Sequence, residues 1–160
     1  MIRNATTADA ERICAIYNHY ILNTAISFEE ERVDAPEMAH RIGEYTKAYP
    51  WLVYEKDCEI LGYCYATKWR ARPAYRHSAE TSVYVHKDHA GEGIGSALYA
   101  ELIARAPGCG VHALVAGITL PNERSQALHE KMGFKKVAHF ADIGNKFGKW
   151  LDVGYWERVL

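Results

Sequence analysis

The sequence has no long apolar run and no excess of charge. None of its 160 residues lies in a stretch of about 18 uninterrupted apolar residues, the length that a membrane span needs, and residues 1–13 contain no long apolar segment. The formal net charge is −1 at pH 7, which gives too weak a field to favour nucleic acid or an anionic membrane as a partner. We therefore expect a cytoplasmic protein that binds neither.

Closely spaced cysteines are also absent. The four cysteines lie far apart in the chain, at Cys14, Cys58, Cys64 and Cys109. This spacing is not that of a zinc site or a redox motif, so we interpret them as core thiols in a reducing compartment. His86 and His89 form a pair, but no set of carboxylates or thiolates accompanies them. We expect no metal.

The chain also lacks internal repeats, low-complexity tracts and Pro/Ser-rich linkers, so one domain over residues 1–160 is expected. The apolar spacing predicts an α/β (α+β) fold with the order βααβββαβαββ, a mixed central sheet of about seven strands flanked by about four helices. The predicted strands are residues 1–3, 51–54, 60–66, 80–85, 113–119, 135–143 and 151–159, with a turn at 55–57. The first predicted helix begins at Thr6 or Thr7, and the second begins after Asp34 and stops before Pro50. The third and fourth cover 94–106 and 123–132. Asn122 is the predicted N-cap of the fourth helix, and Gly133 lies just past its end.

Three glycines stand between the strand at 80–85 and the helix at 94–106. Gly91, Gly93 and Gly95 allow a tight turn, and their N–H groups, with the helix N-terminus, form a concave site for a phosphate or diphosphate. An isolated G-x-G-x-G is as often an ordinary turn. The loop has no Gly-Lys-Ser/Thr ending and no acidic ribose ligand about twenty residues on, which excludes a P-loop and argues against a Rossmann site.

Two motifs in this region resemble those of the GNAT superfamily of N-acetyltransferases. The strand, the G-x-G-x-G loop and the following Ser96-Ala97-Leu98 are similar to its acetyl-CoA diphosphate motif. Residues 122–134 match N-x-x-S-x-x-L-H-x-K-x-G-F in the next helix. Segments 18–20, 69–75, 79–85 and 146–152 together resemble the phosphinothricin acetyltransferase and methionine sulfone/sulfoximine acetyltransferase family, and this resemblance extends over almost the whole chain.

The resemblance implies a GNAT fold and acetyl-CoA as acyl donor. The residues expected to contact it are Val83, Tyr84, Val85, Ala90, Gly91, Glu92, Gly93, Ile94, Gly95, Ser96, Asn122 and Ser125. Ala90 and Glu92 depart from the family pattern, in which these places are usually polar or basic. Their backbone N–H groups are unchanged, so the departure concerns the donor's affinity more than its identity.

Glu80 and His129 are the expected catalytic residues. An ammonium cannot attack a thioester, and the resemblance places Glu80 where it could accept the proton of the amine. His129 occupies the position where the superfamily commonly has a tyrosine acid, and it could protonate the departing thiolate. The alternatives are an ordinary charged residue at a strand start and a structural helix histidine. A backbone N–H of Tyr84 or Val85, beside a local bulge, is expected to stabilise the developing oxyanion.

The acceptor site is expected near a cluster of arginines. Arg70, Arg72 and Arg76 precede Glu80, and guanidinium groups suit an α-amino acid because they bind carboxylates bidentately. At least one of the three is expected to be solvated, and Arg72 and Arg76 are the predicted ligands. The aromatic residues expected to wall the pocket are Phe28, Trp69 and Phe147.

The sequence thus predicts an acetyl-CoA-dependent N-acetyltransferase that acts on the α-amine of a small amino-acid analogue, such as methionine sulfone, methionine sulfoximine or phosphinothricin. The resemblance also implies a homodimer. Two alternatives remain. One keeps the donor and changes the acceptor to a polyamine, a protein N-terminus or a lysine, against which the three arginines argue. The other is a non-catalytic CoA-binding module, against which Glu80 and His129 argue.

Overall fold

The computed structural model describes all residues, 1–160, and is built around a seven-stranded sheet with the order β1-β2-β3-β4-β5-β7-β6. The strands are β1 (Ile2–Asn4), β2 (Trp51–Lys56), β3 (Glu59–Lys68), β4 (Ser78–Val85), β5 (Ala113–Leu120), β6 (Lys135–Lys146) and β7 (Lys149–Val159). β4 and β5 pair in parallel, and all other neighbours are antiparallel. The mixed sheet and the order βααβββαβαββ confirm the sequence prediction.

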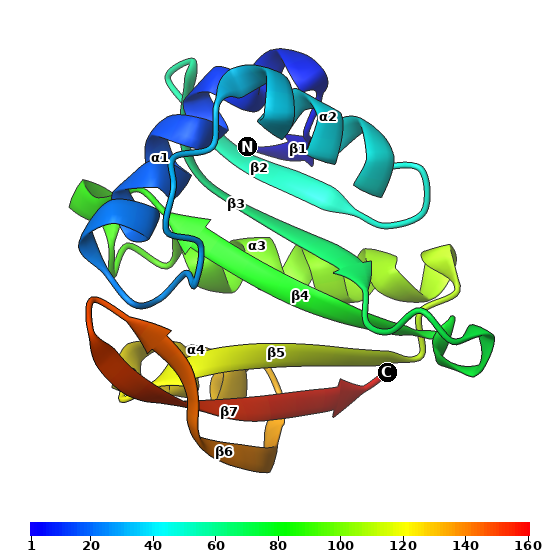
Figure 1. Ribbon diagram of the computed structural model, residues 1–160. Coiled ribbons are helices and arrows are strands. Elements are labelled where there is room, and N and C mark those ends of the chain that lie inside the picture. Colours follow the sequence, from blue (N-terminus) through cyan, green and yellow to red (C-terminus); the bar gives the residue numbers. More distant parts are fainter.

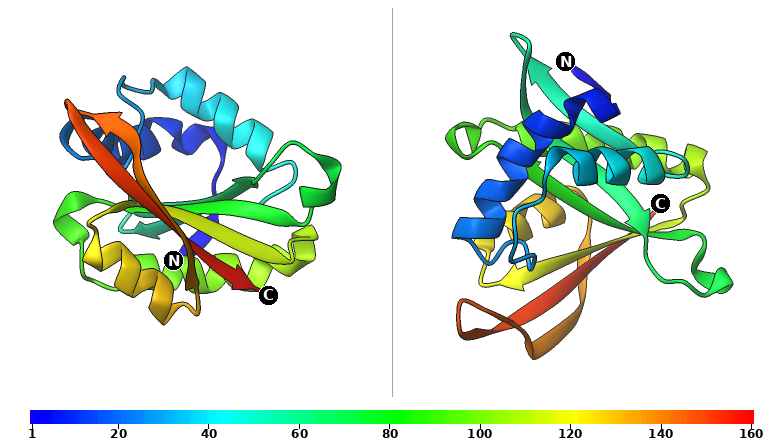
Figure 2. Two further views of the ribbon diagram at one scale, coloured as in Figure 1. Left: turned by 60° about the horizontal axis from the view of Figure 1, so that its bottom comes forward. Right: turned by 45° about the horizontal axis from the view of Figure 1, so that its top comes forward.

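Four helices cover the two faces of the sheet. They are α1 (Ala10–Asn23), α2 (Ala35–Tyr45), α3 (Ile94–Arg105) and α4 (Glu123–Lys131). α1 and α2 lie on one face of the sheet, whereas α3 and α4 lie on the other (Figures 1 and 2). Each face buries its own apolar cluster, one around Ile13, Met38 and Trp51 and one around Leu98 and Trp156. The sheet therefore divides the core into two layers.

The alternation along β4 assigns its side chains to these two layers. Val83 and Val85 pack against the cluster on the α3 side, whereas Tyr84 packs against the cluster under α1 and α2. Successive side chains of a strand point to opposite faces, so Glu80 and Ser82 share the α1 and α2 side with Tyr84. This places any chemistry of Glu80 on the opposite face from α3.

β4 and β5 are paired only at one end. Their pairing joins Ser78–Glu80 to 113–115 and stops there. Beyond that point β4 stays on β3, and β5 stays on β7, so the two strands diverge (Figure 1). The facing edges of 81–85 and 116–120 thus carry backbone groups that no neighbouring strand satisfies. This wedge between β4 and β5 positions the functional site.

The strand ends at two hairpin turns differ from the prediction, because the strands continue further than their apolar residues indicated. β2 continues to Lys56, and the turn falls at Asp57 and Cys58, with φ of 51° and 62°. β6 and β7 extend to a tight turn at Phe147 and Gly148, both with positive φ. Such left-handed pairs make the two-residue hairpin turns whose twist matches the strands.

Two helix boundaries also move. α1 begins at Ala10, after a short 3-10 turn at Thr7–Asp9, rather than directly after Thr6 or Thr7. α2 ends at Tyr45, well before Pro50, and the Thr46 hydroxyl donates to Ile42 O at 2.6 Å. The predicted caps of α4 are confirmed: Asn122 Oδ1 accepts from Ser125 N at 3.1 Å, and Gly133 follows the helix with φ of 83°. Across the structure, no helix is both long and apolar enough to cross a membrane.

Candidate active site

The glycine loop that follows β4 is open to solvent. Residues 90–93 are exposed, and Gly91 and Gly93 adopt φ of 96° and 83°, in the left-handed region that glycine tolerates. The first intrahelical bond of α3 runs from Ala97 N to Gly93 O at 3.0 Å. The N–H groups of Ile94, Gly95 and Ser96 therefore lack intrahelical acceptors, and with the helix dipole they make a site for an anion.

The hydrogen-bond ladder decides which amides of β4 face the wedge. His86 N donates to Leu61 O at 2.8 Å on the β3 side. Because successive N–H groups of a strand point to opposite edges, those of Val83 and Val85 point toward β5, and that of Tyr84 points toward β3. The register with β3 is unbroken from Ala79 to Val85, so the expected bulge in β4 is absent. Val85 remains as the amide that can face an oxyanion.

A narrow cleft follows the wedge on the α4 side. Its lining includes Val83, Asn122, Ser125 and His129, which the sequence grouped around the donor. The cleft opens into a much larger cavity of about 1070 Å³, and the two share the residues Ile26, Ser82, Tyr84, Gly117 and Thr119. An extended ligand in the cleft would thus reach the cavity at the centre of β4.

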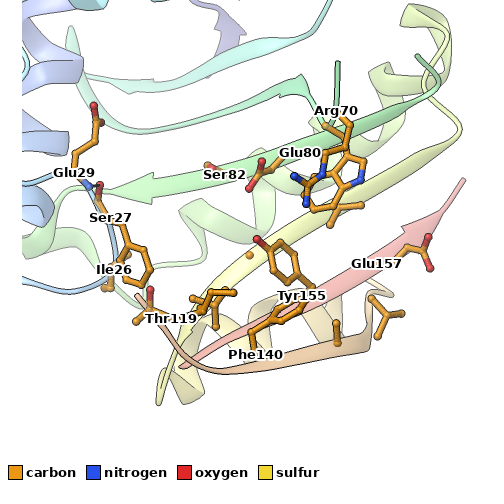
Figure 3. Close-up of a pocket in the computed structure, with 18 of the residues that line it drawn as sticks. Ile26, Ser27, Glu29, Arg70, Glu80, Ser82, Thr119, Phe140, Tyr155 and Glu157 are labelled. Atoms are coloured by element: carbon orange, nitrogen blue, oxygen red, sulfur yellow. Dashed lines mark hydrogen bonds between the residues drawn. The ribbon is translucent and has the colours of Figure 1, made fainter. Parts of the chain in front are cut away.

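The large cavity contains Glu80 and Arg70. Figure 3 shows Arg70 beside Glu80, with Tyr155 and Phe140 across the space. Glu80 is half-buried, and this burial raises the pKa of its carboxyl group, while the charge of Arg70 opposes the rise. A carboxylate of raised pKa is the kind of group that can take a proton from an amine.

Aromatic and aliphatic side chains form most of the other walls. The Arg70 guanidinium lies 4.6 Å from the centre of the Trp69 ring, and Trp69 in turn meets Tyr155 edge-on at 5.5 Å. Phe28 reaches the cavity from the segment between α1 and α2 and covers Gly144 of β6, where a Cβ would lie 2.3 Å from its ring. Trp69 and Phe28 are therefore both at the predicted pocket.

Three residues of the predicted acceptor site lie outside this cavity. Arg72 and Arg76 are exposed, and the Arg76 guanidinium donates only to Pro73 O. Phe147 is 60% exposed at the tip of the β6–β7 hairpin. Within one chain the cavity guanidinium is that of Arg70, which the sequence reasoning considered but did not choose.

His129 is buried with both ring nitrogens engaged. Nδ1 lies 2.7 Å from Ser125 O, which can only accept, so Nδ1 carries the proton. Nε2 then accepts the hydroxyl of Tyr99 at 2.9 Å. Burial lowers the pKa of the ring. The neutral ring therefore has no free N–H, and the role of His129 as an acid stays a prediction. That role requires Nε2 to be protonated and to donate to the Tyr99 hydroxyl, which would then pass its own proton on.

Glu29 lines the cavity but was missed by sequence reasoning. It lies in the irregular segment between α1 and α2, where no periodicity indicates which side chains turn inward. Arg41 of α2 holds its carboxylate with two bonds of 3.0 and 2.8 Å, and the Tyr17 hydroxyl donates to it. Burial alone would raise the pKa of Glu29, but these hydrogen bonds lower it on balance. Glu29 is thus a paired anion.

The comparisons with known proteins agree with this geometry. Residues 2–154 match the family model described as an acetyltransferase (GNAT) domain. The chain is 41% identical to the L-amino acid N-acyltransferase MnaT of Escherichia coli K12, over 99% of this chain and 93% of that protein. It is 39% identical to the L-methionine sulfoximine/L-methionine sulfone acetyltransferase of Salmonella typhimurium, over 99% and 94%.

A solved structure with the same fold is also similar in sequence. The phosphinothricin acetyltransferase of Sinorhizobium meliloti in complex with acetyl-CoA superposes with a TM-score of 0.95 at 35% identity, covering 100% of this chain and 88% of that one. The chain belongs to the GNAT family of N-acetyltransferases. It is an acetyl-CoA-dependent N-acetyltransferase of the phosphinothricin and methionine sulfoximine type.

The residues present fit acetyl-CoA. The loop and the start of α3 offer free N–H groups to the diphosphate, and the edge of β4 offers those of Val83 and Val85 to the rest of the donor, whose linear arm would pair like an added strand. No group of three or more His, Cys, Asp or Glu side chains in the structure could hold a metal ion.

Proposed function

We propose that the protein transfers the acetyl group of acetyl-CoA to the α-amine of a small amino-acid analogue of the methionine sulfone, methionine sulfoximine or phosphinothricin type. The observation that carries this proposal is the junction of the cleft and the cavity. Ser82, Tyr84 and Gly117 line both, and Glu80 stands next to them on β4. A thioester entering from one side and an amine entering from the other would meet beside a carboxylate of raised pKa.

Acceptor binding follows from the charges of the cavity. Arg70 would bind the carboxylate of the amino acid and direct its α-amine toward Glu80. The side chain of the acceptor would extend among Phe28, Phe140 and Val153. The cavity exceeds most small-ligand pockets, which measure roughly 300–1000 Å³, and this leaves room for the acyl end of the donor as well. Arg72 and Arg76 do not line this cavity within one chain, so their role as ligands of the acceptor carboxylate stays a prediction.

Glu80 would accept one proton from the bound ammonium, directly or through water, so that the neutral amine attacks the thioester carbonyl. The Val85 N–H would face the negative charge that grows on the carbonyl oxygen. The C–N bond forms as the C–S bond breaks, and the second proton of the amine goes to the sulfur. The balance is one acetylated amine and one free thiol, with a proton left on Glu80 that returns to solvent.

Replacing Glu80 with glutamine tests the proposal. Glu80→Gln should lower kcat with an amino-acid acceptor by about 10²–10⁴ at neutral pH, because general-base catalysis contributes that much. Calorimetry should give an unchanged Kd for acetyl-CoA, since the donor cleft is intact. Glu157→Gln is the matched control because it removes another carboxylate of the same cavity. Equal turnover in the two variants would remove Glu80 from the mechanism.

A cationic acceptor is the second candidate, because the cavity has three carboxylates and one guanidinium. These are Glu29, Glu80, Glu157 and Arg70. Arg41 already pairs with Glu29, which leaves two free carboxylates and favours the zwitterionic amino acid. A panel of amino-acid analogues, polyamines and peptides, assayed for acetyl-CoA-dependent thiol release, separates the candidates. A higher kcat/KM for polyamines than for amino acids would replace the first proposal with the second.

The proposal includes a cytoplasmic homodimer. All four cysteines are free thiols, as is usual in a reducing compartment, but only Cys14 and Cys64 are buried, so the prediction of core thiols is wrong for Cys58 and Cys109. The β6–β7 hairpin presents exposed apolar side chains, Ile143, Phe147 and Trp150, next to the acceptor cavity. A second copy covering this hairpin would remove them from water. Sedimentation of the purified protein measures this state.

A further inference from the structure

Residues 90–93 of the diphosphate loop carry no positive charge, and Lys87 before them pairs with Asp88. Ala90 is exposed and apolar, and Glu92 adds a carboxylate at the centre of the loop. The Glu92 carboxylate lies against His89, with Nδ1 3.1 and 3.2 Å from its two oxygens. A diphosphate carries negative charge, so a loop with this composition binds it through backbone N–H groups alone unless a cation comes from elsewhere.

Arg124 of α4 is placed to supply that cation. Its Nη2 lies 3.4 Å from the position that a Cβ on Gly91 would occupy, so the guanidinium is in contact with the loop. The side chain is exposed, and none of the ion pairs in the structure involves Arg124. It is therefore an unpaired cation next to the glycine loop.

The local fold holds this residue in position. Asn122 caps α4 and accepts from Ser125 N, which fixes the first turn in which Arg124 lies. On the other side of the loop, the Tyr20 hydroxyl donates to Val85 O at 2.5 Å and ties α1 to the end of β4. The charge of Arg124 reaches Tyr20: burial raises the pKa of that phenol, and the hydrogen bond to Val85 and then the guanidinium oppose the rise. The guanidinium thus lies against the glycine loop, within electrostatic reach of Tyr20 at the end of β4.

We propose that Arg124 binds the diphosphate of acetyl-CoA and supplies from α4 the positive charge that the loop lacks. This rests on the proposed function. A guanidinium can hold phosphate oxygens bidentately, which a backbone N–H cannot. Glu92 in the loop and Glu123 next to Arg124 in α4 are negative, so Arg124 also offsets part of the negative charge of these two segments.

Calorimetry with CoA tests this assignment without requiring turnover. Arg124→Gln should weaken CoA binding by about tenfold, the loss of one charge-assisted contact at an exposed site. Lys131→Gln is the matched control because it removes an exposed positive charge from the other end of α4. The loss in Arg124→Gln should shrink at 1 M salt, where the screening length falls to about 3 Å. Glu92→Lys should restore binding in the Arg124→Gln background.

Each outcome has a distinct meaning. If the wild-type protein binds CoA and both glutamine variants bind it equally well, the role of Arg124 is refuted and the proposed function stands. If the wild-type protein binds no CoA, the proposed function itself fails. A third arm uses 3′-dephospho-CoA. A tenfold loss for both ligands supports the diphosphate contact, whereas a loss for CoA alone would assign Arg124 to the 3′-phosphate and overturn the proposal.

Discussion

Lys146 provides the sharpest test of how the acceptor cavity is built. It is 2% exposed, and its ammonium donates to Ile21 O at 2.7 Å and to Ser27 O at 2.5 Å. These bonds fasten the end of the β6–β7 hairpin to the last turn of α1 and to the segment after it, and Ser27 and Phe28 of that segment form one wall of the cavity. We predict that Lys146→Met destabilises the protein and loosens this wall.

The magnitude follows from the groups left behind. Removing the ammonium leaves two buried carbonyls without donors, at about 1–3 kcal/mol each. Methionine keeps the apolar stem, and the substitution also relieves the cost of burying a charge, so the net loss should be about 2–4 kcal/mol. For a chain of this size that corresponds to a fall of roughly 5–15 °C in Tm. The control is Lys149→Met, an exposed lysine of the same hairpin.

The pH dependence has a definite sign. Burial lowers the pKa of Lys146 below its ordinary value of 10.5. Between the two pKa values the unfolded chain binds more protons than the folded one, so this group's contribution to stability increases as pH rises through that window. The difference in unfolding free energy between the wild type and Lys146→Met should therefore grow toward pH 10.5. Below the folded-state pKa it should be constant.

Urea unfolding gives the stability, and steady-state kinetics gives the second readout. KM for the amino-acid acceptor should rise in Lys146→Met, and the Kd of acetyl-CoA should change less, because Ile26 is the only residue of this segment that lines the donor cleft. A Tm within about 1 °C of that of Lys149→Met would show that the two carbonyls find other donors, and the reasoning would fail.

Much of the fold was predictable because local signals agreed with one another. The change from helical spacing to alternation after Pro50, and the caps Asp34 and Asn122, gave the order of elements. The turn predicted at 55–57 lies at Asp57 and Cys58, and the turn at Phe147 was not predicted, because Cys58 and Phe147 are not usual choices for positive φ. Their conformation is imposed by the register of the paired strands. That register is determined only when the strands pair in the folded chain.

The candidate site was predictable where it lies on regular elements. Glu80 lies on β4, the glycine loop leads into α3, and Asn122 caps α4. The periodicity of these three elements fixes which way their residues face. The acceptor side depends on chain segments that meet only in the folded molecule. Arg70 is at the cavity because β3 ends just before it, and Arg72 and Arg76 flank the exposed 3-10 turn that follows. Sequence spacing cannot distinguish three neighbouring arginines of one loop.

Two further predictions concern charge pairs. Arg70→Met removes the charge that opposes the rise in the Glu80 pKa, so the acidic limb of kcat/KM should move to higher pH and the acceptor KM should rise; if Arg72→Met does this and Arg70→Met does not, the carboxylate site was assigned to the wrong arginine. Hydrogen bonds from Arg3 lower the pKa of Asp9 from 3.8 to about 2. That shift contributes about 2 kcal/mol above pH 3.8, and the contribution is lost as pH falls toward 2. Asp9→Asn should therefore be less stable than the wild type at pH 7 and equally stable at pH 2, and a difference independent of pH in urea unfolding would mean that packing, not charge, makes Asp9 stabilising.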